Sequence, residues 1–355
     1  MSPDMIFIIV CSILGLIAHG SRKVAWLEWI IRSFILLFAC GFALSYGFGG
    51  SFDSPYTLAV NGSLSMILFL ILFRPFRKML SRVLTLLDGV VSLRALTGPL
   101  RHKMTVWASL VSLKIYQEDS IPHLNGLFCF IVCFGVYLAN TNLTSGFSLP
   151  GIPLPMMPLP LDQLFSYNGL GLIAVSACGC GLLVSRRFRE TFVERLGWRK
   201  PTLAQVGIGL GLVVFSFTYD WLWSLFTHAA TPGMASQISA YNSGTFSVGG
   251  AGGAGVNPEN LSAALLLAIA TALCAGIGEE TLIRGAFQPV LGILPAAFLH
   301  GIMHGQFAQA PTLILQVAIW SCCMGIARRF TNTTTTIIGH AGYNLVTTFL
   351  FAFNP

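Results

Sequence analysis

The sequence is poor in charge. Only 9% of its 355 residues are Asp, Glu, Lys or Arg, while 54% are hydrophobic. Soluble domains carry about 25% charged residues, so this composition excludes a water-exposed globular protein. Apolar runs close to the roughly 20 residues of a membrane-spanning helix recur along the whole chain. The sequence therefore predicts an all-α fold, a polytopic transmembrane helical bundle embedded in a lipid bilayer.

Other common signatures are also missing. The nine cysteines form no CxxC set with metal-ligand spacing. The glycine-rich run 249–255 is not followed by Gly-Lys-Ser/Thr, which excludes a phosphate-binding loop. No internal repeat is visible, which counts against a transporter built from inverted halves. The net charge of +7 does not indicate a nucleic-acid partner, because Lys and Arg gather in the cytoplasmic loops of membrane proteins.

The apolar runs predict about ten spans. Lys and Arg occur in alternate connections between them, whereas the connections 49–56, 141–166, 227–260 and 309–310 have none. This alternation predicts that both termini lie outside the cytoplasm. The first run has no basic segment before it, so we expect a span there rather than a cleaved signal. The predicted spans are 5–19, 29–48, 57–73, 124–140, 167–184, 203–226, 261–290, 293–308, 311–327 and 332–353.

One connection has the character of a surface structure. The segment 74–123 is too rich in arginine to span, yet apolar residues recur through it. This pattern predicts one or two helices lying on the cytoplasmic membrane surface. We therefore divide the chain into an N-terminal transmembrane region, 1–202, which contains this basic segment, and a C-terminal core, 203–355.

Ionisable residues inside a membrane are costly and usually functional. Those of the C-terminal core are clustered within three predicted spans. Glu280 and Arg284 are four residues apart on one helix and predict a buried ion pair, which leaves Glu279 without a partner nearby in the sequence. The clustered residues are Glu279, Glu280, Arg284, His300, His304 and His340.

Three of these residues are predicted to lie at one depth. Glu279, His304 and His340 are each 8 to 11 residues from the cytoplasmic end of their spans. At about 1.5 Å per residue this is roughly 12–17 Å from that membrane face. Asp220, in contrast, is expected near the outer interface beside the belt aromatics Trp221 and Trp223.

A carboxylate and several imidazoles at one level can carry out hydrolysis. A carboxylate beside an imidazole can hold and deprotonate a water molecule. His340 and Asn344 share a helix face, and such a pair can stabilise an oxyanion. The same cluster is also suited to zinc, because His300 and His304 have the i, i+4 spacing that places two imidazoles on one metal. A metal-free site and a zinc site formed by His300, His304, His340 and Glu279 therefore both remain open.

At these residues the chain resembles a known family. Glu279-Glu280-Thr-Leu-Ile-Arg284 has the Glu-Glu-x-x-x-Arg pattern of the CAAX-protease and bacteriocin-processing family, also called Abi. His304 stands where the second motif has its His, and His340-Ala-Gly-Tyr-Asn344 matches the third motif, His-x-x-x-Asn. The range 203–355 thus resembles these intramembrane endopeptidases, which are related to the type II CAAX prenyl endopeptidase.

The resemblance implies a role for each matching residue. Glu279 would be the catalytic glutamate and His304 its partner in activating water. His340 and Asn344 would line the oxyanion site. The supporting residues would be Glu280 and Arg284. The family usually has Phe at the position of His300, so this extra imidazole leaves the question of a metal undecided.

The expected function follows from the resemblance. It implies an endopeptidase that cleaves a membrane-associated or prenylated-type protein or peptide in a cavity facing the cytoplasm. The expected location is the inner membrane of a bacterium. Two alternatives remain: a non-proteolytic bacteriocin-immunity or scaffold protein, and a proton-coupled transporter that uses the buried acids and histidines as a relay.

Overall fold

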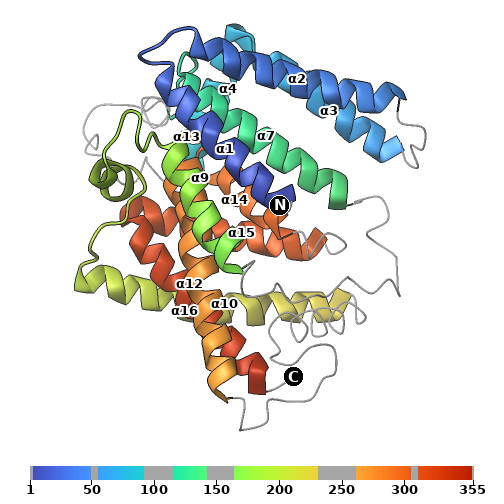
Figure 1. Ribbon diagram of the computed structural model, residues 1–355. Coiled ribbons are helices and arrows are strands. Elements are labelled where there is room, and N and C mark those ends of the chain that lie inside the picture. Colours follow the sequence, from blue (N-terminus) through green and yellow to red (C-terminus); the bar gives the residue numbers. More distant parts are fainter. Residues whose placement is uncertain are drawn as a thin grey trace, which may run out of the picture.

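The computed structural model describes residues 3–48, 55–91, 115–141, 164–230, 261–304 and 311–353. Within these ranges the regular structure is helical, and no strand is present (Figure 1). This confirms the predicted all-α fold class. A helix covers the main part of every predicted span, because long apolar runs satisfy their backbone hydrogen bonds internally only as helices.

The elements fall into two sets along the chain. The N-terminal set comprises α1 Pro3–Gly20, α2 Leu27–Phe48, α3 Pro55–Leu70, α4 Arg74–Val91, α7 Ile121–Thr141, η1 Leu164–Gly171, α9 Leu172–Gly179 and η2 Glu190–Arg195. The C-terminal set comprises α10 Leu203–Ala230, α12 Leu261–Glu280, η4 Thr281–Phe287, α13 Gln288–Leu291, α14 Ile293–Met303, α15 Pro311–Phe330 and α16 Thr333–Phe353. The elements written η are π-helical turns.

Within the described residues, three helices are long and apolar enough to cross a membrane. They are Leu27–Leu44, Leu203–Phe226 and Thr312–Phe330. A fourth candidate is the bent pair Ala59–Leu70 and Arg74–Val91, whose axes meet at 105°. The chain is therefore helical with membrane-spanning character, while the full number of about ten spans and the orientation of the termini remain predictions.

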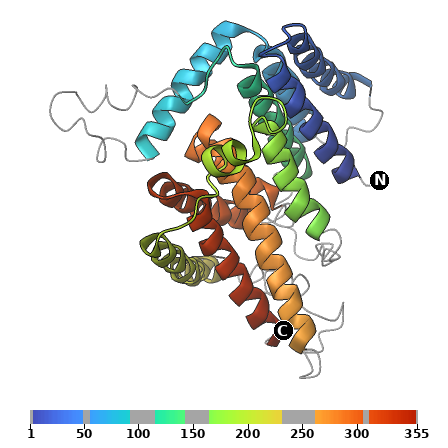
Figure 2. The ribbon, with the colours of Figure 1, turned by 60° about the vertical axis from the view of Figure 1, so that its left-hand side comes forward.

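The helices pack in pairs around the middle of the molecule. Helices α12 and α16 lie side by side, as do α1 and α9 (Figure 2). Helix α14 packs against α15, and α10 packs against α16. The clustered polar residues of the C-terminal core thus lie on α12, η4, α14 and α16, and α15 packs against both α14 and α16.

The two predicted regions share one hydrophobic core. Buried residues of α1, α2, α3 and α7 form a single cluster with residues of η4, α13 and α14. Ile283 and Leu299 of the C-terminal core contribute to this cluster with no exposed surface. The N-terminal helices therefore brace the helices that carry the polar residues.

Small residues allow close helix contacts near the polar cluster. A Cβ atom at Gly276 of α12 would lie 2.7 Å from the Cβ of Ala341 on α16. A Cβ atom at Gly301 of α14 would lie 2.6 Å from the carbonyl oxygen of Ile314 on α15. Both helix pairs approach closely because glycine has no side chain, as is common in helical membrane proteins.

Helix α4, in the predicted surface segment, has its polar face inward. The Arg77 guanidinium is buried and donates to the carbonyl oxygens of Ile71, Leu72 and Glu118 at 2.7–2.8 Å. An apolar stripe is instead exposed on the outer side. This stripe is Met79, Val83, Leu87 and Val90. A helix whose exposed face is apolar fits a membrane surface, although residues 92–114 of the same segment lie outside the described residues.

Asp88 of α4 anchors the start of α14. Its Oδ1 accepts a hydrogen bond from the backbone N–H of Ile293 at 3.1 Å, and its Oδ2 accepts one from Arg329 at 2.5 Å. The preceding residue, Gly292, has φ +91°, in the left-handed region that favours glycine. Helix α4, the α13–α14 turn and the end of α15 are therefore held together by Asp88.

Candidate active site

Two adjacent carboxylates lie at the centre of the polar cluster. Glu279 and Glu280 are the last residues of α12, and the π-helical element η4 follows at once. Neighbouring residues on a helix point about 100° apart, so the two side chains face different helices. π-helical turns are often found at functional sites, where they change the direction of side chains.

Both carboxylate oxygens of Glu280 are bound to buried side chains. Its Oε2 lies 3.3 Å from Nε of Arg284, and neither side chain has exposed surface. Its Oε1 lies 3.2 Å from Nδ1 of His340 on α16. Arg284 in turn donates through Nη2 to the hydroxyl of Ser321 on α15 at 2.6 Å. The ion pair that the i, i+4 spacing predicts is therefore present, and it connects α12, η4, α15 and α16.

Glu279 faces α14 instead. Its Oε2 lies 2.9 Å from Nε2 of His300, which has no exposed surface. The Glu279 side chain is 13% exposed, whereas that of Glu280 is 0% exposed. Of the two carboxylates, Glu279 is thus the one that a substrate or water molecule can reach.

The two imidazoles nearest the carboxylates are held at their Nδ1 atoms. Nδ1 of His300 lies 3.1 Å from the hydroxyl oxygen of Ser321, and Nδ1 of His340 lies against Glu280. The two ring centroids are 5.6 Å apart. Because Glu280 is paired with an arginine, which always carries its proton, its carboxylate is an acceptor. His340 therefore donates through Nδ1–H, and the Nε2 atom of the neutral ring keeps a lone pair.

Trp320 forms one wall of the site. Its ring centroid is 5.0 Å from that of His340 and 5.7 Å from that of His300. Its indole N–H donates to the hydroxyl of Ser216 on α10 at 2.7 Å, which fixes the ring. Trp320 is 8% exposed, so this wall is apolar and excludes bulk water from one side.

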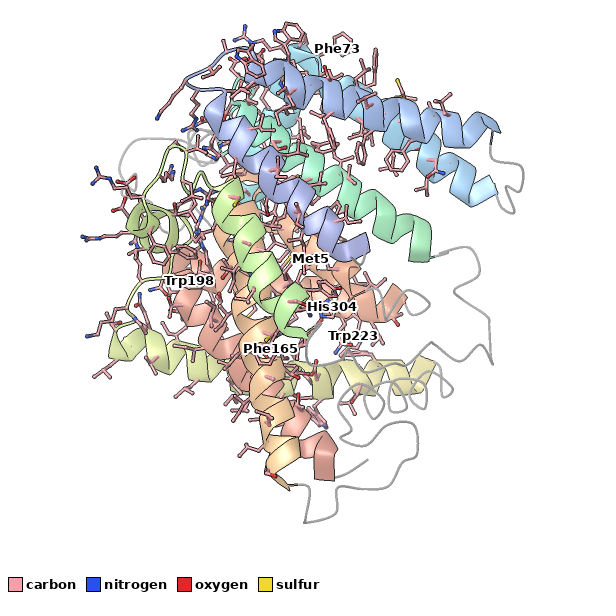
Figure 3. All side chains as sticks on the ribbon, in the orientation of Figure 1. Met5, Phe73, Phe165, Trp198, Trp223 and His304 are labelled. Carbon is pink, nitrogen blue, oxygen red and sulfur yellow. The ribbon has the colours of Figure 1, made fainter. Side chains whose placement is uncertain are left out.

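His304 lies next to His300, and Asn344 lies on the same helix as His340. His304 directly follows α14, its Nδ1 is 2.9 Å from the carbonyl oxygen of His300, and its ring centroid is 5.2 Å from that of His300. It lies near the middle of the molecule, far from Phe73 at one end (Figure 3). Asn344 follows His340 by one turn of α16 and is half-buried. The structure thus brings Glu279, Glu280, Arg284 and the three histidines into one neighbourhood, with His300 making the direct contact to Glu279.

The cluster includes a set of donor atoms suited to a metal ion. One ligand atom from each of Glu279, His300 and His340 lies within 4.8 Å of the other two. His304, which the sequence analysis included among possible ligands, is outside this set. Sequence reasoning also missed Ser321, because an isolated serine in an apolar helix gives no signal until its neighbours in space are known.

Asp220 belongs to a separate polar network. Its Oδ1 accepts a hydrogen bond from Gln316 of α15 at 2.8 Å, and its Oδ2 accepts one from the hydroxyl of Tyr343 on α16. Tyr343 is also near Trp320, with ring centroids 6.5 Å apart. Asp220 therefore joins α10, α15 and α16, a contact that its sequence neighbours Trp221 and Trp223 did not indicate.

Comparison with known proteins gives one match. Residues 261–346 match a family model described as "Rce1-like: Type II CAAX prenyl endopeptidase Rce1-like". No curated protein and no solved structure matches the chain. The family match confirms the resemblance to CAAX-type membrane proteases, and it contains Glu279, Glu280, Arg284, His300, His304, His340 and Asn344.

Proposed function

We propose that this protein is an intramembrane endopeptidase that hydrolyses a peptide bond of a membrane-associated protein or peptide. The observation that carries the proposal is the pairing of Glu279 with His300 at 2.9 Å, in which only the carboxylate has exposed surface. A carboxylate next to an imidazole is suited to general acid–base catalysis. The family match over 261–346 supports a peptide bond as the target.

The two glutamates have different electrostatic surroundings, which supports different roles. Glu280 is neutralised by Arg284 and spans to His340, so it holds the site together. Glu279 contacts an imidazole instead of a guanidinium. A reacting base must be able to take up and release a proton, which a carboxylate locked to arginine does poorly. Glu279 is therefore the proposed general base.

The proposed reaction is a direct attack by water. Glu279, with an imidazole of the His300 and His304 pair, holds a water molecule and takes its proton while the water oxygen bonds to the scissile carbonyl carbon. The carbonyl oxygen becomes an oxyanion, and the Asn344 amide donates a hydrogen bond to it. Glu279 then returns the proton to the leaving amine as the C–N bond breaks. His340 contributes a donor at Nε2 only when its ring is protonated, because Nδ1–H is directed to Glu280.

The proposed substrate enters from the cytoplasmic side. Two basic residues lie near η4 and the start of α14. Arg329 is bonded to Asp88, which also holds the backbone N–H of Ile293. Arg195 donates to the carbonyl oxygen of Gly285 at 2.6 Å. Lys and Arg mark the cytoplasmic side of membrane proteins. Prenylated CAAX proteins or other lipid-anchored peptides fit an entry at that face, and a bacterial inner membrane is the proposed location.

The test compares the proteomes of cells that express wild type or the variant Glu279→Gln. New peptide termini should appear only with wild type, and their precursors should accumulate with the variant. The cleavage rate of the variant should be lower by about 10²–10⁴-fold, the contribution typical of a general base. Glu194→Gln is the matched control, because Glu194 is exposed and its loss removes the same charge outside the buried polar cluster.

The two alternative functions predict different results in the same cells. A scaffold or immunity protein would leave the termini identical in wild type and Glu279→Gln. A proton-coupled transporter would give solute uptake in vesicles that depends on the proton gradient and is reduced by Glu279→Gln. Identical termini at equal expression would reject the protease proposal.

A further inference from the structure

We infer that Asp220 is a positioning residue that sets the orientation of His340 and His300 in the candidate active site. It acts on them through Tyr343 and Trp320. The inference deepens the proposed function, and it rests on that function only for the purpose of the two imidazoles. An ionisable side chain within a membrane-spanning helix is costly and usually functional. Asp220 lies in one of the three candidate spans, and its two carboxylate oxygens bond to two other helices, α15 and α16.

The first link is a ladder of two hydrogen bonds between α10 and α15. The Trp320 indole N–H donates to the hydroxyl oxygen of Ser216 at 2.7 Å. One turn away on both helices, the Gln316 side-chain amide donates to Oδ1 of Asp220 at 2.8 Å. Because residues four apart share a helix face, these two bonds together fix the rotation of α10 and α15 relative to each other. Trp320 lies at one end of this ladder and Asp220 at the other.

The second link joins the ladder to α16. Oδ2 of Asp220 accepts a hydrogen bond from the hydroxyl of Tyr343. Tyr343 is three residues after His340 and directly before Asn344, so this bond holds the turn of α16 that carries both. Residues three apart are neighbours on a helix surface, so Tyr343 and His340 lie on the same side of α16. One carboxylate thus connects the helix that carries Trp320 with the helix that carries His340.

Aromatic packing connects the ladder to the imidazoles. The ring centroid of Trp320 is 5.0 Å from that of His340 and 5.7 Å from that of His300. The two imidazoles are 5.6 Å apart, so the three rings pack against one another. The Tyr343 ring is 6.5 Å from that of Trp320, on the side of Asp220. Because close-packed side chains transmit strain, a displacement of the Trp320 ring moves both imidazoles.

Two substitutions of Asp220 separate positioning from simple attachment of the helices. A side chain that only held three helices together would affect stability alone. A positioning residue also changes the surroundings of the imidazoles and the rate of the chemical step. Asp220→Ala removes both acceptors. Asp220→Asn keeps an acceptor for the Tyr343 hydroxyl and can donate to the Gln316 amide oxygen, so it should recover most of what the Ala variant loses.

The first experiment observes the imidazoles directly and needs no substrate. Protein with isotope-labelled histidine rings is purified in detergent and examined by NMR. Trp320 lies against both imidazoles, so its displacement changes the ring current that they experience. The signals of His300 and His340 should therefore shift in Asp220→Ala and in Tyr343→Phe. Tyr343→Phe keeps the aromatic ring and provides the answer if Asp220→Ala does not fold.

Tyr219→Phe is the matched control. It also removes a tyrosine hydroxyl that connects α10 with α15, in this case through the backbone carbonyl oxygen of Gln316 at 3.0 Å. It should lower the thermal stability about as much as Tyr343→Phe, yet leave the imidazole signals of the site in place. His19, bonded to the backbone of α9, provides an internal reference signal. Equal shifts in Tyr219→Phe and Tyr343→Phe, or none in either Tyr343→Phe or a folded Asp220→Ala, would overturn the inference.

Kinetics provide the second readout. The probe is a fluorogenic farnesylated peptide with a CAAX C-terminus, chosen because of the family match. Misplacement of reacting groups by about 1 Å can cost about 10²-fold in rate. Asp220→Ala should therefore lower kcat by about 10–100-fold with little change in KM, and Asp220→Asn should recover most of this loss. An unchanged kcat with a raised KM would contradict a positioning role.

The two readouts separate this inference from the proposed function. Unmoved imidazole signals and an unchanged kcat in Asp220→Ala would overturn the inference, while cleavage of the peptide by wild type would still support the function. Shifted signals in Asp220→Ala and Tyr343→Phe, with no cleavage by wild type, would support the positioning of the imidazoles and count against the proposed protease.

Discussion

Nδ1 of His340 lies 3.2 Å from Glu280, not from its neighbour Glu279. The imidazole on α16 is therefore oriented by the carboxylate that is already neutralised by Arg284. The partly exposed carboxylate, Glu279, contacts the imidazole on α14. Two adjacent residues thus organise two different helices, and their substitutions should have different consequences.

Glu280→Gln should destabilise the protein much more than Glu279→Gln. It leaves Arg284 buried without a counter-ion, and breaking such a pair costs about 3–5 kcal/mol. Glu279→Gln leaves the Glu280–Arg284 pair in place, so the variant should remain folded and inserted. The measurement is thermal unfolding of both variants in the same detergent. Equal losses of stability would show that Glu280 does not hold the structure in the way described.

A double substitution should recover part of that loss. Replacing both partners, Glu280→Gln with Arg284→Met, removes the unpaired charge, so its cost should be smaller than the sum of the two single costs. The coupling free energy follows from unfolding of the wild type, the two single variants and the double variant. Strict additivity would mean that the 3.3 Å contact contributes nothing.

Gly276→Val should reduce catalysis by separating α12 from α16. A Cβ atom at this position would lie 2.7 Å from the Cβ of Ala341, so the larger side chain forces the helices apart. Overpacking of this kind costs about 1–3 kcal/mol. The readouts are peptide cleavage and thermal unfolding. Gly211→Val on α10 is the control, because its Cβ atom meets no atom within 4 Å, and it should have little effect.

Asp88→Ala and Asp88→Asn should separate two roles of one side chain. Asn keeps an acceptor for the Ile293 N–H but loses the charge opposite Arg329, whereas Ala loses both. Loss of a helix-start acceptor costs about 0.5–2 kcal/mol. Amide hydrogen exchange over 288–296 should therefore rise more in the Ala variant than in the Asn variant. Unchanged exchange in both would contradict the anchoring of α14 by α4.

The sequence predicted contacts within helices better than contacts between them. The spacing of Glu280 and Arg284 was sufficient to predict their ion pair, because residues four apart share a helix face. Residue counting placed His304 level with Glu279, but it is His300, one turn earlier, that makes the direct contact. Which residue faces a neighbouring helix depends on the rotation of each helix about its axis, and a single sequence does not encode this in its spacing.

Ser321 illustrates the same limit. It lies within the apolar run of α15 and touches both Arg284 and His300, yet its sequence neighbours include no other polar residue that would draw attention to it. The locations of the helices could be predicted, since apolar length alone determines them. The partners of the buried polar groups could not, because they are brought together only by tertiary packing.

The outward apolar stripe of α4 has a practical consequence for biochemistry. The apolar side chains of Met79, Val83, Leu87 and Val90 are exposed on one face of α4, while the opposite face of the same helix fixes the start of α14 through Asp88. Helix α14, which carries His300, is therefore attached to an element whose position depends on its amphiphilic surroundings. Rates measured in micelles will report on the detergent as well as on the enzyme, and nanodiscs of defined thickness are the medium in which different variants can be compared.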